Sequence, residues 1–329
     1  LISIITAEEN IRLAYRNLKK NAGSRTPGTD GKTIADLAKM SEPELIGFVQ
    51  QKFNWYQPQS VRRKEIPKGN GKTRPLGIPT IMDRLIQQCV LQVMEPICEA
   101  KFCETSNGFR PNRGVENALA QAEKHMQKSN LHIVIEGDIK GFFDNVNHGK
   151  LLRQIWAMGI HDKKLLSIIS AMLKAEVAGI GFPEKGTPQG GILSPLLSNI
   201  VLNELDWWIT SQWVGMPTRH EYSGKIHENG TKDQSKKYRE LRKTNLKECY
   251  IVRYADDFKI FCRKHSDAVK LFEATRAWLK ERLGLDISPE KSKIVNLKHA
   301  YSDFLGFRIK VHKGKRNQYV VISHIAPKA

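Results

Sequence analysis

Three aspartates occupy positions from which their carboxylates can act together. Asp138 follows the apolar, β-branched run at 131–135, which is typical of a short buried strand. Asp256 and Asp257 lie in a tight tetrapeptide, YADD, between two further strand-like runs, so a hairpin is expected to carry them at its tip. Three carboxylates at one edge of a sheet can hold the two metal ions that phosphoryl transfer to a hydroxyl requires. Aspartates also favour turns without any catalytic role, so the pair alone leaves both interpretations open.

The segments around these aspartates alternate between strand and helix patterns. A helix is expected to begin at Ser194-Pro195, because serine caps helices and proline favours their first turn. A second helix is expected over 266–283, with Gly284 as its end. The order strand, helix, hairpin, helix, strand predicts an α+β fold. In it, an antiparallel sheet carries helices on one face, in the split βαβ or ferredoxin-like arrangement.

The composition indicates a polyanionic partner. The 329 residues include 53 Lys and Arg against 34 Asp and Glu, a formal net charge of +19, which favours nucleic acid. No apolar run has transmembrane length and no signal-peptide pattern opens the sequence. We therefore expect no membrane partner and a cytoplasmic location, in the bacterial cytosol or associated with the nucleoid. The 5 cysteines form no CxxC pair, so neither a disulfide framework nor a zinc site is indicated.

The tetrapeptide at 254–257 resembles the YxDD signature of reverse transcriptases. Other stretches resemble further motifs of these enzymes, in the expected order: RPLGIPTIMDR and NGFRPNRG of the fingers, then IVIEGDIKGFFDNVNH, GTPQGGILSPLLSNI, ISPEKSKI and FLGFRI of the palm. The resemblance covers about residues 60–310. The wording of the motifs is closest to group II intron-encoded reverse transcriptases (maturases). Domesticated and CRISPR-associated relatives share much of the same palm.

This resemblance implies the right-hand polymerase fold, with fingers and a palm. We expect an N-terminal extension and loop at 1–40, fingers at 41–130 and the palm at 131–329. Within the palm, residues near 163–185 are expected to associate with the fingers, and 210–247 to form an exposed basic insertion. Family members continue into a helical thumb, and none is visible after the last palm motif.

The resemblance also assigns the metal site by position. Asp138, Asp256 and Asp257 match the metal-binding carboxylates, which are the catalytic residues. The backbone carbonyl of Ile139 matches a further ligand. The expected cofactor is Mg²⁺, as two ions, for which Mn²⁺ is expected to substitute.

Five positions match residues that contact the incoming nucleotide: Lys68, Arg74, Phe143, Gln189 and Lys291. The first two match fingers cations that close on the triphosphate. Phe143 matches the aromatic under the deoxyribose, which excludes a 2′-hydroxyl and selects dNTPs over rNTPs. Gln189 matches the residue beside the template base. Lys291 matches the lysine that protonates the departing pyrophosphate, although the lysine two positions later is near enough to take this role.

Basic residues outside the motifs are candidates for RNA binding, because family members dock intron RNA through the region before the fingers and other basic surfaces. The candidates are Arg12, Arg16, Lys19, Lys20 and Arg25, and, in the insertion, Lys236, Lys237, Arg242 and Lys243. For the insertion, the alternative is a solvated loop that only aids solubility. Arg110 and Arg113 either touch nucleic acid or brace the fingers.

The resemblance implies an RNA-directed DNA polymerase that also binds intron RNA as a splicing cofactor. Its partners would be an RNA template with primer, dNTPs, intron RNA and target DNA, and a homodimer is left open. Two other functions compete with this one: a binding-only maturase whose polymerase site has decayed, and an RNA-templated RNA polymerase. The intact aspartates with Phe143 and Gln189 argue against decay, and Phe143 at the sugar position argues against RNA synthesis.

Overall fold

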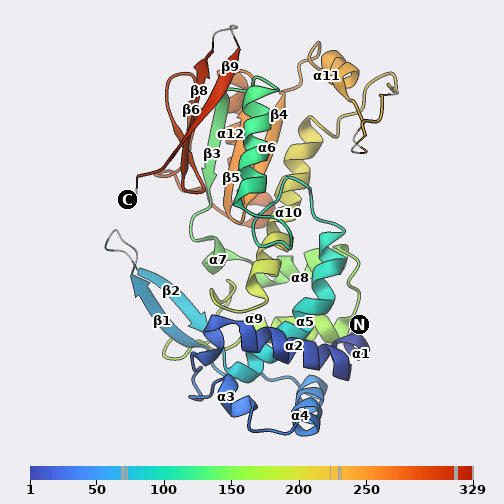
Figure 1. Cartoon of the computed structure of the whole chain (residues 1–329), viewed down its shortest axis with the longest axis vertical. Coiled ribbons are helices and arrows are strands. Elements are labelled where there is room, and N and C mark those ends of the chain that lie inside the picture. Colours follow the sequence, from blue (N-terminus) through green and yellow to red (C-terminus); the bar gives the residue numbers. More distant parts are fainter. Residues whose placement is uncertain are drawn as a thin grey trace.

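The computed structural model describes residues 1–67, 71, 73–222, 224–228, 230, 232–314 and 318–327. Two lobes follow one another along the long axis of the molecule (Figure 1). One lobe is mostly helical, the other is built on a β-sheet, and the long helix α10 (Ser194–Gln212) runs from one to the other. Among the described residues, no helix has the length and apolar character needed to span a bilayer.

A four-stranded antiparallel sheet forms the centre of the second lobe. Its strands are β3 (Ile133–Asp138), β4 (Cys249–Tyr254), β5 (Asp257–Cys262) and β6 (Lys293–Asn296). Across the sheet their order is β4-β5-β3-β6, and each neighbouring pair is antiparallel. Helices connect β3 to β4 and β5 to β6, which makes this the split βαβ order. The predicted α+β, ferredoxin-like palm is confirmed.

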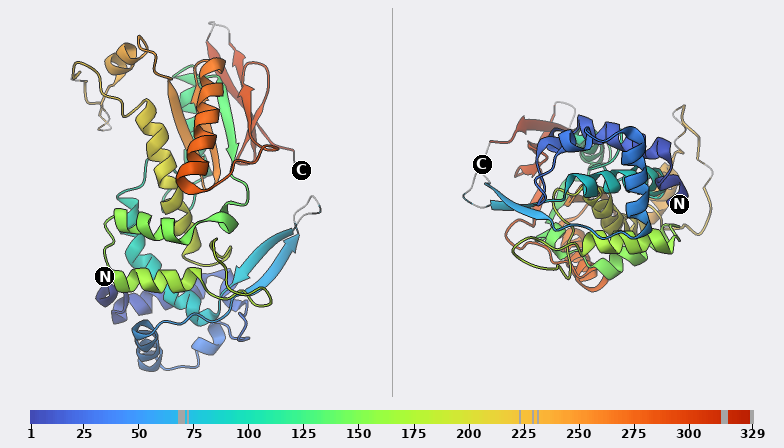
Figure 2. Two further views of the ribbon diagram at one scale, coloured as in Figure 1. Left: turned by 180° about the vertical axis from the view of Figure 1, so that it is seen from behind. Right: turned by 90° about the horizontal axis from the view of Figure 1, so that it is seen from below.

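Both faces of this sheet are covered, whereas the sequence predicted helices on one face only. α12 (His265–Trp278) and the π-helical turn η2 (Leu279–Leu283) pack on one face, where Ile133 joins the main core. α6 (Val115–Gln127) packs on the other face, where Val134 joins a second core. α6 lies in front of the sheet in Figure 1, and α12 lies in front of it in the view from behind (Figure 2, left). Side chains of a strand alternate between faces, so the two cores share each strand. α6 lies inside the stretch predicted as fingers, which is why the sequence left this face open.

A second, three-stranded antiparallel sheet lies beside the first. It consists of β7 (Ser302–Phe304), β8 (Phe307–Lys313) and β9 (Tyr319–Ile325). Its apolar side chains join α6 in the second core, and β9 contacts α6 directly. The FLGFRI motif therefore forms the turn between β7 and β8.

The helical lobe is organised around α5 (Ile81–Glu99), much of which is buried. α2 (Glu8–Lys20) packs against α5 through a stripe of small and aliphatic residues, including Ala14 and Leu18. The remaining helices are α1 (Ile2–Ile5), η1 (Ala22–Arg25), α3 (Ile34–Leu37), α4 (Glu42–Asn54), α7 (Phe142–Asn145), α8 (His148–Ala157) and α9 (Lys163–Leu173).

A two-stranded hairpin projects from this lobe (Figure 1). It is formed by β1 (Arg62–Pro67) and β2 (Thr73–Ile78), which pair in antiparallel register. The loop after α9 lies at the base of the hairpin, because Val177 bridges to Val61. This contact joins residues that are far apart in the sequence.

The basic segment 210–247 is anchored to the sheet lobe at two points. Trp213 is fully buried, and its indole N–H donates to the Tyr250 hydroxyl at 3.0 Å. α11 (Ser235–Leu241) buries Leu241. The many charged residues of the segment concealed these apolar anchors in the sequence.

Candidate active site

The sheet brings the three predicted aspartates to one edge. β3 and β5 are in register so that Asp138 lies directly opposite Asp257. Asp256 belongs to the two-residue turn that joins β4 to β5, because Tyr254 pairs with Asp257 across the hairpin. Ala255, the first residue of this turn, has a φ of 56°. Tight hairpin turns require such left-handed backbone, which turns the chain so that two successive aspartates reach the same edge.

Burial and mutual repulsion raise the pKa of two of these carboxyls. For Asp257, burial is the largest cause, and the charges of Asp256 and Asp138 add to it, which raises its pKa to about 6. Burial and the Asp138 charge also raise the pKa of Asp256, against the opposing charges of Arg74 and Lys291. Carboxylates that repel one another at a half-buried edge gain when a cation binds between them.

The donor set suits a hard divalent cation, because such ions prefer oxygen ligands. In the described part of the chain, no three Asp, Glu, His or Cys side chains are grouped closely enough to enclose a metal ion. The aspartates would therefore provide only part of a coordination shell. Mg²⁺ is commonly bound in this way, by one or two carboxylates with water and substrate phosphates in the other positions.

The backbone after Asp138 leaves one predicted ligand available. Ile139 and Ile287 form an isolated antiparallel bridge, in which the peptide groups on either side of Ile139 make the hydrogen bonds. The Ile139 carbonyl itself takes no part in this bridge. Its role as a metal ligand stays a prediction.

Two lysines near the sheet edge have different partners. Lys291 Nζ lies 3.3 Å from each carboxylate oxygen of Asp138, and the lysine side chain is 67% exposed. Lys293 Nζ instead lies 3.7 Å from a carboxylate oxygen of Glu136. The sequence left open which of these lysines could protonate the pyrophosphate. Of the two, Lys291 is the one that lies beside an aspartate of this edge.

Phe143 lies on α7, shortly after the strand that carries Asp138. Phe142 is buried in the core, whereas Phe143 is half-buried, and their rings meet edge to face with centroids 5.3 Å apart. The Thr187 N–H donates to the Phe143 carbonyl at 2.7 Å, so the loop that carries Gln189 is fastened to this backbone. Phe143 thus packs against the main core without being fully buried in it, and its role at the sugar stays a prediction.

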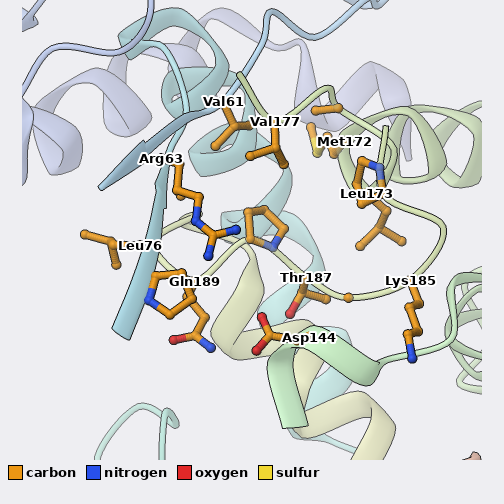
Figure 3. A pocket seen from close by; sticks show the side chains of 16 residues that line it. Val61, Arg63, Leu76, Asp144, Met172, Leu173, Val177, Lys185, Thr187 and Gln189 are labelled. Atoms are coloured by element: carbon orange, nitrogen blue, oxygen red, sulfur yellow. The ribbon is translucent and has the colours of Figure 1, made fainter. Parts of the chain in front are cut away.

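Gln189 lines a pocket of about 160 Å³ at the base of the β1–β2 hairpin (Figure 3). Arg63 from β1 and Asp144 from α7 line the same pocket. The Gln189 carbonyl accepts a hydrogen bond from the Gly77 N–H at 2.6 Å, which ties this loop to β2. The β1–β2 hairpin, α7 and the loop that carries Gln189 are distant in sequence. They meet beside Phe143, next to the predicted nucleotide position.

The predicted fingers cations lie on the hairpin. Arg74 is exposed on β2, opposite Ile66, and its positive charge opposes the rise in the pKa of Asp256. Lys68 lies outside the described residues. Arg74 is thus placed where its charge acts on the sheet edge that carries the aspartates.

The N-terminal candidates for RNA binding differ in how free their charges are. Four of them are exposed on α2 and η1: Arg16, Lys19, Lys20 and Arg25. Arg12 instead donates to the carboxylates of Glu42 at 2.6 Å and Glu8 at 3.0 Å. These contacts offset its charge, so Arg12 is the weakest candidate of the group.

In the basic insertion, Lys236 is exposed. The other three candidates make contacts within the protein: Lys237 with the Val214 carbonyl, Arg242 with the Glu248 carboxylate, and Lys243 with the Glu240 carboxylate. The Arg242 contact also anchors the segment, because Glu248 is buried.

Arg110 and Arg113 differ in how far the protein engages them. The Arg110 side chain is 4% exposed, and it donates to both carboxylate oxygens of Glu99 and to the carbonyls of Cys103 and Ser106. Arg113 donates to a backbone carbonyl of the same loop. The structure therefore favours bracing for Arg110, one of the two roles that the sequence left open.

Arg253, one residue before the YADD turn, was not singled out from the sequence. It is completely buried and pairs with Asp206 of α10, which is also completely buried. The available signal was a basic residue in an otherwise apolar strand, next to two catalytic candidates. Its partner lies 47 positions away, with no periodic relation to it.

Residues 66–309 match the family described as reverse transcriptase (RNA-dependent DNA polymerase). Protein YkfC of Escherichia coli is 33% identical over 336 residues, which cover 99% of this chain and 86% of YkfC. The group II intron-encoded protein LtrA of Lactococcus lactis is 36% identical over 342 residues, 92% of this chain and 55% of LtrA. The putative COX1/OXI3 intron 2 protein of Saccharomyces cerevisiae is 28% identical over 358 residues, 98% of this chain and 40% of that protein. The chain thus spans about half, or less, of these two intron-encoded relatives.

Proposed function

Because the chain belongs to the reverse transcriptase (RNA-dependent DNA polymerase) family, we propose that it copies RNA into DNA by adding dNTPs to a primer. Similarity to LtrA confirms the relationship with group II intron-encoded proteins that the motifs predicted. The observation that best supports the activity is the sheet edge, where Asp138 faces Asp257 and Asp256 stands in the adjoining turn.

These three aspartates are proposed to hold two Mg²⁺ ions, which Mn²⁺ can replace. When bound, the ions would activate the primer hydroxyl and shield the charge of the leaving pyrophosphate. Ion binding requires ionised carboxylates, and the pKa of Asp257 is about 6. Protons should therefore compete with the metal, so that metal affinity and extension both fall as the pH is lowered through 6.

The side chains around this edge have separate tasks in the proposal. Phe143 excludes the 2′-hydroxyl of an rNTP, and Gln189 borders the template base. Arg74, together with Lys68, binds the triphosphate. Lys291, whose exposed ammonium lies 3.3 Å from Asp138, gives a proton to the departing pyrophosphate.

Primer extension on an RNA template, first with dNTPs and then with rNTPs, tests the activity. The parent chain should extend with dNTPs, and an Asp256→Asn control should not, because the variant has lost one metal-binding charge. A parent that binds RNA but extends no primer would instead support the binding-only maturase. Extension with rNTPs as fast as with dNTPs would support the RNA polymerase.

Intron RNA is the further partner that we propose, in a role as splicing cofactor, with target DNA as an additional nucleic acid and a homodimer as the candidate assembly. Similarity to a group II intron-encoded protein supports this proposal, as do the exposed cations of α2 and η1. Structured RNA should bind better than an unstructured strand of equal length, because proteins largely recognise RNA through shape, loops and 2′-hydroxyls. Competition between the two RNAs in a filter-binding assay measures this preference.

A further inference from the structure

The guanidinium of Arg253 is fully engaged directly beneath the metal-binding turn. Its Nε lies 2.9 and 3.0 Å from the two carboxylate oxygens of Asp206, and Nη2 lies 2.6 Å from one of them. Nη2 also donates to Ser106 Oγ at 2.7 Å, and Nη1 donates to Asn199 Oδ1 at 3.0 Å. The remaining bond runs from Nη1 to the carbonyl of Ala255, at 2.7 Å. Every N–H of the planar fork therefore has an acceptor, an arrangement that lysine cannot reproduce.

Arg253 and Asn199 also hold the loop at 105–109, which contains the start of the NGFRPNRG motif, against the turn. The Arg253 carbonyl accepts from the Asn107 N–H at 2.9 Å. Asn199, which accepts from Arg253, donates to the Gly108 carbonyl at 2.8 Å. Gly108 lies so close to the turn that a Cβ on it would stand 2.4 Å from the Ala255 nitrogen. Only glycine fits at this position without moving the turn.

The peptide that these groups hold is the one that precedes the first metal-binding carboxylate of the turn. Ala255 has left-handed backbone, with φ 56°, which is unfavourable for a residue with a Cβ. Its carbonyl is fixed by Arg253, and its nitrogen is packed against Gly108. The direction of the following residue, Asp256, depends on the orientation of this peptide.

A buried ion pair is a weak source of stability, because the loss of hydration offsets much of the attraction between the charges. Apolar residues of similar size in the place of such a pair often give the same or a higher stability. The Arg253 guanidinium of this pair also donates hydrogen bonds to three other groups: Asn199 of α10, Ser106 of the 105–109 loop and the Ala255 carbonyl of the turn. These contacts are better explained if the pair fixes the backbone of the turn than if it mainly stabilises the fold.

We propose that Arg253 is a positioning residue of the polymerase site. Together with Asp206 and Asn199, it fixes the Ala255 carbonyl and thereby presents Asp256 and Asp257 to the metal ions. The inference rests on the proposed metal-dependent function and adds to it the group that sets the geometry of the turn.

Two variants separate positioning from stability. Arg253→Lys keeps the positive charge opposite Asp206 and loses the fork. Arg253→Met combined with Asp206→Leu removes both charges, so that neither remains buried and unpaired. The control is Arg282→Met with Glu204→Leu, which removes an exposed ion pair (3.1 Å) between η2 and α10, the helix that also carries Asp206. Urea unfolding and RNA binding establish that each variant is folded.

Two readouts follow on the folded proteins. In primer extension, both Arg253 variants should show kcat reduced by about tenfold or more, as for other supporting groups of metal sites, with the KM for dNTP little changed and a higher Mg²⁺ requirement. The second readout is Mn²⁺ affinity, measured by electron paramagnetic resonance without substrate, with Asp256→Asn defining the specific site. This affinity should fall in the Arg253 variants and stay unchanged in the control.

The two readouts distinguish failure of the inference from failure of the proposed function. A parent chain without extension would remove the proposed polymerase activity, while its Mn²⁺ affinity would still judge the role of Arg253. Mn²⁺ affinity and kcat equal to the parent in the folded double variant would overturn the inference. Mn²⁺ binding that Asp256→Asn leaves unchanged would overturn it too, because there would then be no metal site to position.

Discussion

Asp257 should destabilise the metal-free protein, and Asp257→Asn should therefore stabilise it while destroying activity. The pKa of this carboxyl is raised from 3.8 to about 6, chiefly by burial. At about 1.36 kcal/mol per pKa unit, a rise of about 2 units means that the ionised carboxylate costs the folded state about 3 kcal/mol at pH 8. Asparagine has nearly the same shape and no charge, so the variant should recover much of this free energy of unfolding.

The gain should depend on pH in a defined direction. Because the pKa of Asp257 is higher in the folded than in the unfolded chain, the folded protein binds the extra proton between about pH 4 and 6. The stability of the parent therefore rises as the pH falls through this window. The advantage of the variant, about 3 kcal/mol at pH 8, should shrink to about half at pH 5.

Urea unfolding in the presence of a chelator, at pH 8 and pH 5, measures both quantities by linear extrapolation. Asp36→Asn is a control of opposite sign, because hydrogen bonds from Lys39 and Thr33 lower the pKa of Asp36 to about 2, so this variant should lose stability at pH 8. The reasoning is refuted if Asp257→Asn is no more stable than the parent at pH 8, or if its gain is the same at both pH values.

Three further predictions concern synthesis and binding. Asp138→Asn should reduce primer extension by orders of magnitude while RNA affinity persists, and retained extension would exclude it as a metal ligand. Phe143→Ala should admit rNTPs, measured as the ratio of single dNTP to rNTP incorporation; an unchanged ratio would make Phe143 an ordinary core residue. Lys236→Glu with Arg239→Glu changes two exposed cations and spares the anchors of the insertion. RNA affinity should fall, and the log-log salt slope should decrease by about 0.7–0.9 for each lost contact; an unchanged slope would leave α2 and η1 as the binding surface.

The parts of the structure that the sequence predicted are those encoded by local patterns. The hairpin around Asp256 and the helix that ends at Gly284, whose φ is 72°, follow from the spacing of apolar residues and from turn chemistry. α10 begins at Ser194 as expected, but Ser194 does not cap it: the N-cap residue is Leu193, and the serine hydroxyl donates to the Pro188 carbonyl. The meeting of Asp138 with the hairpin was also predictable, because the order of elements specifies the sheet.

Contacts between distant segments have no such local signature. α6 shows only an amphipathic pattern, which does not say which surface receives its apolar face. The buried partner of Arg253 lies on another helix, and the indole of Trp213 is anchored by Tyr250, 37 positions away. In each case the residue type hinted that a partner exists, and only the fold identified it.

The turn that carries Asp256, proposed above to bind metal, has repelling charges on one side and a matched ion pair on the other. On the sheet edge, Asp138, Asp256 and Asp257 repel one another. Without a cation between them, this repulsion favours movement of the carboxylates away from one another. Beneath the turn, Arg253 binds the Ala255 carbonyl through a guanidinium whose charge is matched by Asp206. Because the ion pair is neutral as a whole, it can fix the backbone without neutralising the carboxylates that the metal needs. A single unpaired arginine in the same place would have held the turn and competed with the ions for their ligands.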